Sequence, residues 1–356
     1  MNSDPPTDPA RPVGTPEVVP SPPRPIWARL FIGWTILISA EVFSGASLKQ
    51  GLWHPWTLLV TYWLYFGHFF FFTTLSIWTR RTSLSSLYLW GVLFGLYESW
   101  ITKVIWHGYE GNGNLVLGSM GPFGFSEFSM VVIFHPVMAF ILPLAAAGVV
   151  FPSLRPLFPG INWLIKPGRG PLLVRIYMIL SLGTIVAMNS GGPLNLLVNL
   201  GFGALVFGVL LNQSKPCRQL VDARPIVVFG RKGYIGLCLY LGLLYGVTYF
   251  HLRPEGLPSA SVQWLTAAMY AIPIIGLWLQ PRGTPRETSM DQGSLDQDRK
   301  ALITLVGSVL GLGLIGSLFA GQPALYVAVL VSFIFWTPVG FILIAMTWVE
   351  GLRSRG

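Results

Sequence analysis

Long runs of apolar residues are the feature that most limits what this chain can fold into. A helix of about 20 apolar residues can cross the ~30 Å hydrocarbon core of a bilayer. The sequence contains about ten such runs. They lie at 27–46, 55–79, 84–107, 125–151, 171–189, 194–212, 233–250, 262–280, 301–320 and 325–349. We therefore predict an all-α, polytopic integral membrane bundle of about ten transmembrane helices.

The composition supports this class over a soluble protein. Hydrophobic residues make up 53% of the 356 residues and charged residues only 10%, whereas a soluble domain carries roughly 25% charged residues. Cys217 and Cys238 form neither a disulfide framework nor a zinc signature. The net charge of +9 is explained below by membrane topology, so we expect membrane lipids as partners and no nucleic acid.

The basic residues predict the orientation of the helices. With the N-terminus inside, all but three of the 23 Lys and Arg residues fall in the inner segments. The three on the outer side are Lys49, Lys103 and Arg253. Enrichment of Lys and Arg on the cytoplasmic side is the usual orientation signal. We therefore predict a multi-pass protein of the plasma membrane with both termini in the cytoplasm.

The chain divides into two unequal membrane parts flanked by tails. Residues 1–25 are rich in proline and contain no apolar run, which predicts a disordered cytoplasmic tail. Residues 26–152 form a four-helix half that carries the intramembrane Glu, Lys and His residues. Residues 153–350 form a six-helix half, rich in Gly, Leu and Val, with a mainly structural role. Residues 351–356 are a short cytoplasmic tail.

Ionisable side chains inside the first four spans are the strongest functional signal. Glu41, His68, Glu98 and His135 each lie in a different span. An acidic side chain at this depth costs at least ~2.5–3.5 kcal/mol on insertion scales, so its presence usually marks a site or a pathway. Helical rise places the four within roughly 7 Å of depth, toward the outer leaflet. Because Glu and His bind hard or borderline ions, these four residues are a candidate site for a divalent metal.

A second group of polar residues lies nearer the outer surface. Lys103 and His107 are four residues apart and share one face of the third span. We take Glu98, Lys103, His135 and His107 as the candidate catalytic set and predict that Glu98, Lys103 and His135 line one cavity. His135 precedes Pro136, which frees carbonyls one turn earlier and kinks the helix.

The segment 108–125, which follows the third span, is unusually rich in glycine and in apolar residues for an outer loop. Two interpretations remain open for it. The segment either dips back toward the bilayer to cover a cavity, or forms a compact surface loop packed on the helix ends.

The polar cluster is compatible with several functions. A membrane-embedded enzyme open to the outer leaflet, acting on a lipid-like or membrane-associated substrate, fits polar residues that thin out toward the cytoplasm. A proton-coupled secondary transporter is the main alternative, because buried carboxylates make proton relays. Haem bound by His68 and His135 and a purely structural or assembly role are further alternatives.

Overall fold

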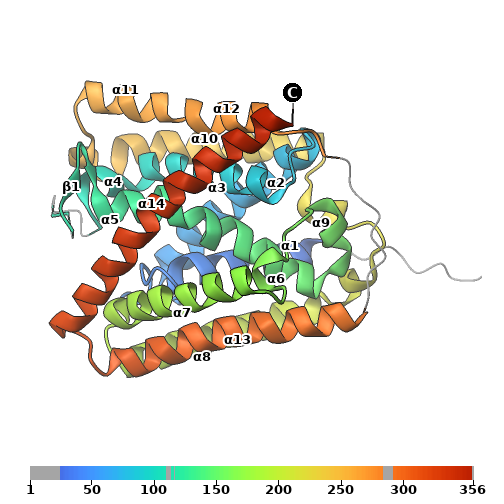
Figure 1. The fold of residues 1–356 in the computed structure, drawn as a ribbon, viewed down its shortest axis with the longest axis horizontal. Helices are drawn as coiled ribbons and strands as arrows, with labels where there is room; N and C mark the ends of the chain where they lie inside the picture. Colours follow the sequence, from blue (N-terminus) through green and yellow to red (C-terminus); the bar gives the residue numbers. More distant parts are fainter. Residues whose placement is uncertain (1–24, 110–113, 116, 284–291, 355–356) are drawn as a thin grey trace, which may run out of the picture.

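The protein is a bundle of helices with a single short hairpin among its described residues (Figure 1). The computed structural model describes residues 25–109, 114–115, 117–283 and 292–354. The predicted proline-rich tail lies outside this part of the chain, apart from Pro25. The prediction of an all-α membrane bundle is confirmed.

The regular elements follow the apolar runs of the sequence. The α-helices are α1 (Ile26–Leu37), α2 (Tyr62–Trp78), α3 (Leu84–Thr102), α4 (Val104–His107), α5 (Phe125–Phe128), α6 (Leu142–Val150), α7 (Arg169–Asn189), α8 (Pro193–Gln213), α9 (Arg224–Val227), α10 (Arg231–His251), α11 (Ala260–Met269), α12 (Ala271–Leu279), α13 (Gln292–Ser317) and α14 (Pro323–Arg353). Four segments are π-helical, namely η1 (Ile38–Val42), η2 (Thr57–Thr61), η3 (Ser129–Phe134) and η4 (Pro136–Ile141). Short 3-10 helices are η5 (Pro152–Leu157), η6 (Trp163–Ile165), η7 (Lys215–Gln219) and η8 (Pro254–Gly256). Strands β1 (Ser119–Met120) and β2 (Phe123–Gly124) form the antiparallel hairpin.

Among the described residues, eight helices are long and apolar enough to cross a membrane. They correspond to all the predicted spans except 27–46 and 84–107. Those two regions are helical as well. The first is short, because α1 has 12 residues and η1 adds 5. The second, α3, has 19 residues, but its mean hydropathy is lower than that of the eight membrane-length helices.

The first helices form the centre of the bundle and the later ones surround it. In Figure 1, α1, α2, α3 and α6 lie inside, with α7, α8 and α13 on one side and α10, α11 and α12 on the other. In an apolar 18-residue stretch of Phe125–Val150, 94% of the residues are buried, whereas in a similar stretch of Pro193–Gln213 only 17% are buried. The later helices expose large apolar side chains such as Leu194 and Leu239, as expected for helices that face lipid.

Three of the predicted spans are shortened or divided in an informative way. The first helical segment ends at Val42 rather than residue 46, and Gly45 follows with a φ of 76°. The third ends at Thr102 because Lys103 is left-handed, with a φ of 57°. The predicted span 262–280 is divided at Tyr270 into α11 and α12. The first two ends are accompanied by a positive φ at a single residue, which an apolar run does not reveal. Tyr270 instead keeps helical dihedrals (φ −61°, ψ −25°), and Pro273, which has no backbone N–H to donate, follows within the next turn.

The sequence separates spans 171–189 and 194–212 by four residues, and the structure has a tight turn there. Helix α7 ends at Asn189 and α8 begins at Pro193. Gly191 and Gly192 between them have positive φ values of 68° and 110°, which glycine adopts at little cost. The Pro at the first position of α8 has no backbone N–H to leave unpaired.

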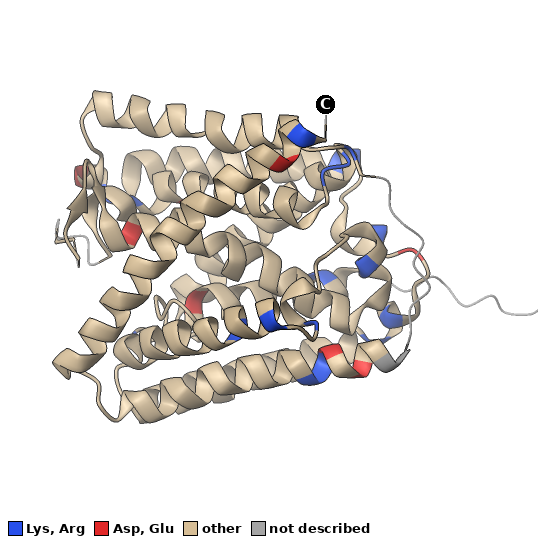
Figure 2. Cartoon of the chain, viewed as in Figure 1, with Lys and Arg blue, Asp and Glu red and all other residues tan. Residues whose placement is uncertain are grey.

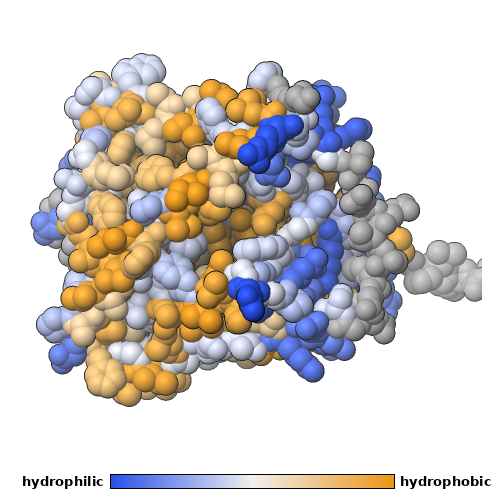
Figure 3. Space-filling model, in the orientation of Figure 1, coloured by the Kyte–Doolittle hydropathy of each residue, from blue (hydrophilic) through white to orange (hydrophobic). Residues whose placement is uncertain are grey.

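Charge is distributed unevenly along the bundle. Figure 2 shows most Lys and Arg residues at the end where the C-terminus lies. Figure 3 shows hydrophilic residues gathered at that same end and apolar residues spread over the visible flank. An apolar flank bounded by a basic end is the surface expected of a membrane-spanning bundle.

Candidate active site

The candidate site lies where α3 packs directly against the fourth predicted span. Two glycines of α3 allow this approach. A Cβ on Gly95 would lie 2.1 Å from the carbonyl oxygen of Val131, and one on Gly91 would lie 2.6 Å from Cβ of Pro136. The two backbones are therefore in contact, and their side chains Glu98 and His135 meet beside this contact.

The fourth span is π-helical on both sides of His135. Segment η3 precedes this residue and η4, which begins at Pro136, follows it. Wider π turns expose backbone carbonyls, and other helices use them here: Tyr88 donates to the Ile133 carbonyl at 3.0 Å, and Ser39 donates to the Met138 carbonyl at 2.7 Å. Such π-helical segments occur frequently at functional sites.

Glu98 and His135 form a close pair at the centre of the site. Glu98 Oε2 lies 2.9 Å from Nε2 of His135. The two residues are 7% and 4% exposed, so little water competes with their interaction. A carboxylate in contact with one imidazole nitrogen fixes the orientation of the ring and stabilises its protonated form.

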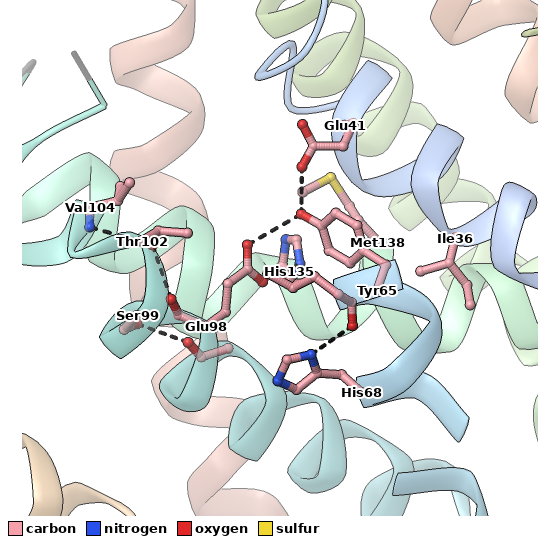
Figure 4. A network of polar contacts seen from close by, with 12 residues as sticks. Ile36, Glu41, Tyr65, His68, Glu98, Ser99, Thr102, Val104, His135 and Met138 are labelled. Atoms are coloured by element: carbon pink, nitrogen blue, oxygen red, sulfur yellow. Dashed lines mark hydrogen bonds and ion pairs between the residues drawn. The ribbon is translucent and has the colours of Figure 1, made fainter. Parts of the chain in front are cut away.

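Tyr65 joins this pair to Glu41 (Figure 4). Its hydroxyl lies 2.6 Å from Oε1 of Glu41 and 3.2 Å from Oε1 of Glu98. Oε2 of Glu41 accepts a hydrogen bond of 2.5 Å from the Ser47 hydroxyl. The result is one continuous chain of polar groups, Ser47–Glu41–Tyr65–Glu98–His135, drawn from four separate helical segments and the loop after η1.

If Glu41 and Glu98 are both ionised, this chain of polar groups has one proton too few to make both hydrogen bonds at Tyr65. A phenol has a single O–H donor, yet the Tyr65 oxygen contacts both carboxyl groups. Two good hydrogen bonds at this oxygen require that one carboxyl group donates a proton of its own. The arrangement therefore suits a shared, transferable proton, and burial of like charges favours the same state.

His68 lies beside the network and is held by neutral contacts. Its Nδ1 lies 2.7 Å from the Leu64 carbonyl. The ring stacks on the Phe94 ring, with 4.7 Å between the two centroids, and packs edge-on with the Tyr97 ring, with 4.5 Å between the centroids. Nε2 is buried and has no hydrogen-bond partner among the described residues. With Nδ1 donating to the carbonyl, Nε2 is an acceptor directed into the interior.

Tyr109 and Glu127 lie at the outer edge of the site. Glu127 is fully buried and accepts a 2.9 Å hydrogen bond from the Ser126 hydroxyl. Tyr109 as a whole residue is 36% exposed, whereas its phenol group is buried. Burial of its phenol, and then the negative charges of Glu127, Glu98 and Glu41, raise the pKa of Tyr109 well above its ordinary value. Three carboxylates therefore act electrostatically on this one phenol.

The prediction that Lys103 shares a cavity with Glu98 and His135 is wrong. Its left-handed backbone ends α3 and turns the side chain toward α10. Nζ donates to the carbonyls of Thr248, at 2.7 Å, and of Leu252. These carbonyls form the C-terminal end of α10, where a cation is favoured by the helix dipole.

His107, the fourth residue of the candidate catalytic set, is also separate from the network. A Cβ added to Gly256 would lie 3.1 Å from Cβ of His107, so this histidine packs beside η8. The structure thus joins Glu41, Glu98 and His135 through Tyr65, with His68 beside them. It places Lys103 and His107 in a second group at the end of α10.

The geometry gives little support to the metal and haem interpretations. Among the described residues, no three His, Cys, Asp or Glu side chains are arranged as ligands of one metal ion. Glu41 and Glu98 are separated by the Tyr65 hydroxyl. The centroid of the Phe94 ring lies 4.7 Å from that of His68 and 5.5 Å from that of His135. This phenyl ring occupies the space that a haem between the two histidines would need.

Tyr65 was missed by reasoning from the sequence. Tyrosine is common in membrane helices, so its presence between Trp63 and Phe66 gives no functional signal. One signal was available, because Tyr65 lies three residues before His68 and therefore shares a helix face with it. Ser47, beyond the end of the first helix, had no comparable signal.

The fold and site define a multi-pass helical membrane protein with a buried carboxyl–phenol–imidazole cluster. The chain belongs to a family described as an uncharacterized membrane protein family, whose model matches residues 30–353. It is also similar to a protein of Archaeoglobus fulgidus described as an uncharacterized protein, with 35% identity over 126 residues. That alignment covers 35% of this chain and 38% of the relative. No solved structure matches the chain.

Proposed function

We propose that this protein is a membrane-embedded enzyme whose acid–base centre is the pair Glu98–His135. Its substrate is a lipid-like or membrane-associated molecule that enters from the outer leaflet. In this proposal the protein lies in the plasma membrane, with both termini in the cytoplasm. The gathering of Lys and Arg at one end of the bundle supports this orientation, because basic residues are enriched on the cytoplasmic side.

The observation that carries the proposal is the 2.9 Å contact between Glu98 and His135. With Nε2 directed at the carboxylate, Nδ1 of the imidazole serves as the base. It takes a proton from a water molecule or a substrate hydroxyl as that oxygen attacks, and it returns the proton to the leaving group. Glu98 stabilises the imidazolium formed between these two steps, as the carboxylate of a catalytic triad does.

Tyr65 and Glu41 add further groups that can hold or pass on a proton next to Glu98. The short contacts on either side of the Tyr65 hydroxyl, 2.6 Å and 3.2 Å, let a proton pass between the two carboxyl groups without bulk water. These groups can give a proton to Glu98 or take one from it. The Phe94 ring, whose centroid lies 5.8 Å from that of Tyr65 and 5.5 Å from that of His135, gives these polar groups an apolar surrounding that strengthens each electrostatic contact.

A proton-coupled transporter is the second candidate, and a specific observation favours it. Polar groups from four helical segments form one continuous path, Glu41–Tyr65–Glu98–His135, and buried carboxyl chains of this kind serve as proton relays. A structural cluster is the third candidate, because the same contacts also tie these segments together.

One experiment on the full chain separates the three. The purified protein is reconstituted in vesicles of phosphatidylethanolamine, phosphatidylglycerol and a polyprenyl phosphate. Lipid products are followed by mass spectrometry, and proton entry is followed with a trapped pH dye. Wild type is compared with Glu98→Gln and His135→Gln. The control is Glu350→Gln, since Glu350 is an exposed residue whose carboxylate, within the part of the chain that the structure describes, accepts a hydrogen bond only from the Ser85 hydroxyl, at 2.5 Å.

We expect lipid conversion by wild type and by Glu350→Gln, and a loss of about 10²–10⁴-fold in both site variants, as for removal of a general base. Proton entry that requires Glu98 and His135, without lipid conversion, would establish the transporter instead. If the variants change only the thermal stability, the cluster is structural and both functional proposals are wrong.

A further inference from the structure

A basic groove lies at the far end of α2 from the Glu98 site. Two cavities of about 440 and 560 Å³ meet there and share Trp78 and Arg80 in their walls. The first also includes Arg224, and the second includes Arg282 and Trp278. We propose that this groove binds the phosphate headgroup of an anionic phospholipid of the inner leaflet. The proposal is independent of the reaction at Glu98 and His135.

The turn that presents Arg80 is held rigidly. Arg80 has a left-handed backbone with a φ of 57°, and its carbonyl accepts a 2.9 Å hydrogen bond from the N–H of Gly283. The next residue, Arg81, donates to the Trp278 carbonyl at 3.0 Å and accepts from the Trp90 indole at 3.1 Å. These bonds fix a conformation that is uncommon for a residue with a side chain, so the Arg80 position is defined before any ligand arrives.

The arginines of the groove are not neutralised by carboxylates among the described residues that line it. Arg80, Arg224 and Arg282 are exposed. The described residues that line the two cavities include no Asp or Glu. Arg224 lies 3.9 Å from Asp222, but both side chains are about 60% exposed, and such a pair is worth little in water. Guanidinium groups match phosphate oxygens in both charge and geometry.

The walls of the groove favour a lipid over a soluble anion. Trp78, Ile274 and Trp278 are 48%, 52% and 62% exposed, and all three line the cavities. Large exposed apolar side chains beside arginines match a molecule with a charged head and an apolar tail. Trp is enriched at the level of lipid headgroups, and clustered basic residues there bind anionic lipids.

Lipid binding to the full chain in a neutral detergent tests the proposal. Native mass spectrometry compares phosphatidylglycerol with phosphatidylcholine on wild type, Arg80→Asn, Arg282→Gln and the double variant. Asn is chosen at position 80 because it tolerates the left-handed backbone. Arg231→Gln is the matched control, since Arg231 is an exposed arginine at the start of α10 that does not line either cavity. Inorganic phosphate is added in a parallel titration.

We expect wild type to prefer phosphatidylglycerol, and each groove variant to weaken that binding about fivefold, which is what a contribution of about 1 kcal/mol per arginine predicts. The double variant should lose about 25-fold, and Arg231→Gln should bind as wild type does. If Arg80→Asn does not fold, Arg282→Gln and Arg224→Gln, both changed at exposed positions, provide the same comparison. The proposal is overturned if Arg231→Gln weakens binding equally, if phosphatidylcholine binds as well, or if millimolar phosphate displaces the lipid.

Discussion

Glu98 and His135 meet across two helices whose backbones are in contact. Their side-chain atoms Oε2 and Nε2 are 2.9 Å apart, and the glycine face of α3 lies against η3 and η4. The pairing therefore depends on how closely α3 approaches the fourth span.

Gly95→Ala should separate the catalytic pair. The new Cβ would lie 2.1 Å from the Val131 carbonyl oxygen, so α3 or η3 must move. We expect a stability loss of about 1–3 kcal/mol, typical of overpacking, and a loss of any activity that requires Glu98 and His135. Thermal unfolding and the vesicle assay measure both. Gly208→Ala is the control, because a Cβ there meets no atom within 4 Å. Equal behaviour of the two variants would contradict the close-approach argument.

Tyr65→Phe should break the link between Glu41 and Glu98. The phenol oxygen contacts both carboxyl groups, and a buried acceptor without a donor costs about 1–3 kcal/mol. The carboxyl C=O bands in the infrared spectrum should also shift. Tyr62→Phe is the matched control, because the Tyr62 hydroxyl contacts only a backbone carbonyl, that of Leu30 at 3.1 Å, among the contacts described. Unchanged carboxyl bands in Tyr65→Phe would show that Tyr65 does not bridge the two groups.

Lys103→Met should lower stability without removing acid–base chemistry. The variant loses the hydrogen bonds from Nζ to the Thr248 and Leu252 carbonyls, together with a cation at the C-terminus of α10. A hydrogen bond to a charged group contributes about 1.5–3 kcal/mol. The check is thermal unfolding together with lipid conversion measured well below the unfolding temperature. A loss of activity greater than that of His135→Gln would restore Lys103 to the catalytic site.

Asp298→Asn should be far more destabilising than Asp296→Asn, although both lie in the first turns of α13. Asp298 is 3% exposed and pairs with Arg155 at 2.9 Å, and it also accepts a 3.3 Å hydrogen bond from Asn162. Breaking a buried ion pair costs about 3–5 kcal/mol.

Asp296 provides the comparison within the same helix. It faces Arg299 at 3.8 Å, with side chains 75% and 61% exposed, and such surface pairs contribute about 0–1 kcal/mol. Denaturant unfolding in detergent compares the two variants. Similar losses in both would mean that the Arg155–Asp298 contact does not connect η5 to α13 in solution.

The sequence by itself determined the class of the protein and most of its helices. A membrane span is recognised from the mean hydropathy of about 20 residues, so a polar residue at one position does not change the assignment. The same reasoning located Glu41, His68, Glu98 and His135, because a polar residue in an apolar helix is conspicuous wherever the helix packs. The Ser190–Gly192 turn was also predictable, since glycine and proline act locally.

The tertiary structure decided which of these groups touch. A residue's direction around a helix changes by about 100° per position, so contacts depend on helix rotation and on local breaks that composition does not reveal. The left-handed backbone of Lys103 removed that residue from the predicted site, and the close packing of α3 against η3 and η4 brought Glu98 to His135. Tyr65, which joins the two carboxyl groups, became recognisable only once four helical segments had packed around it.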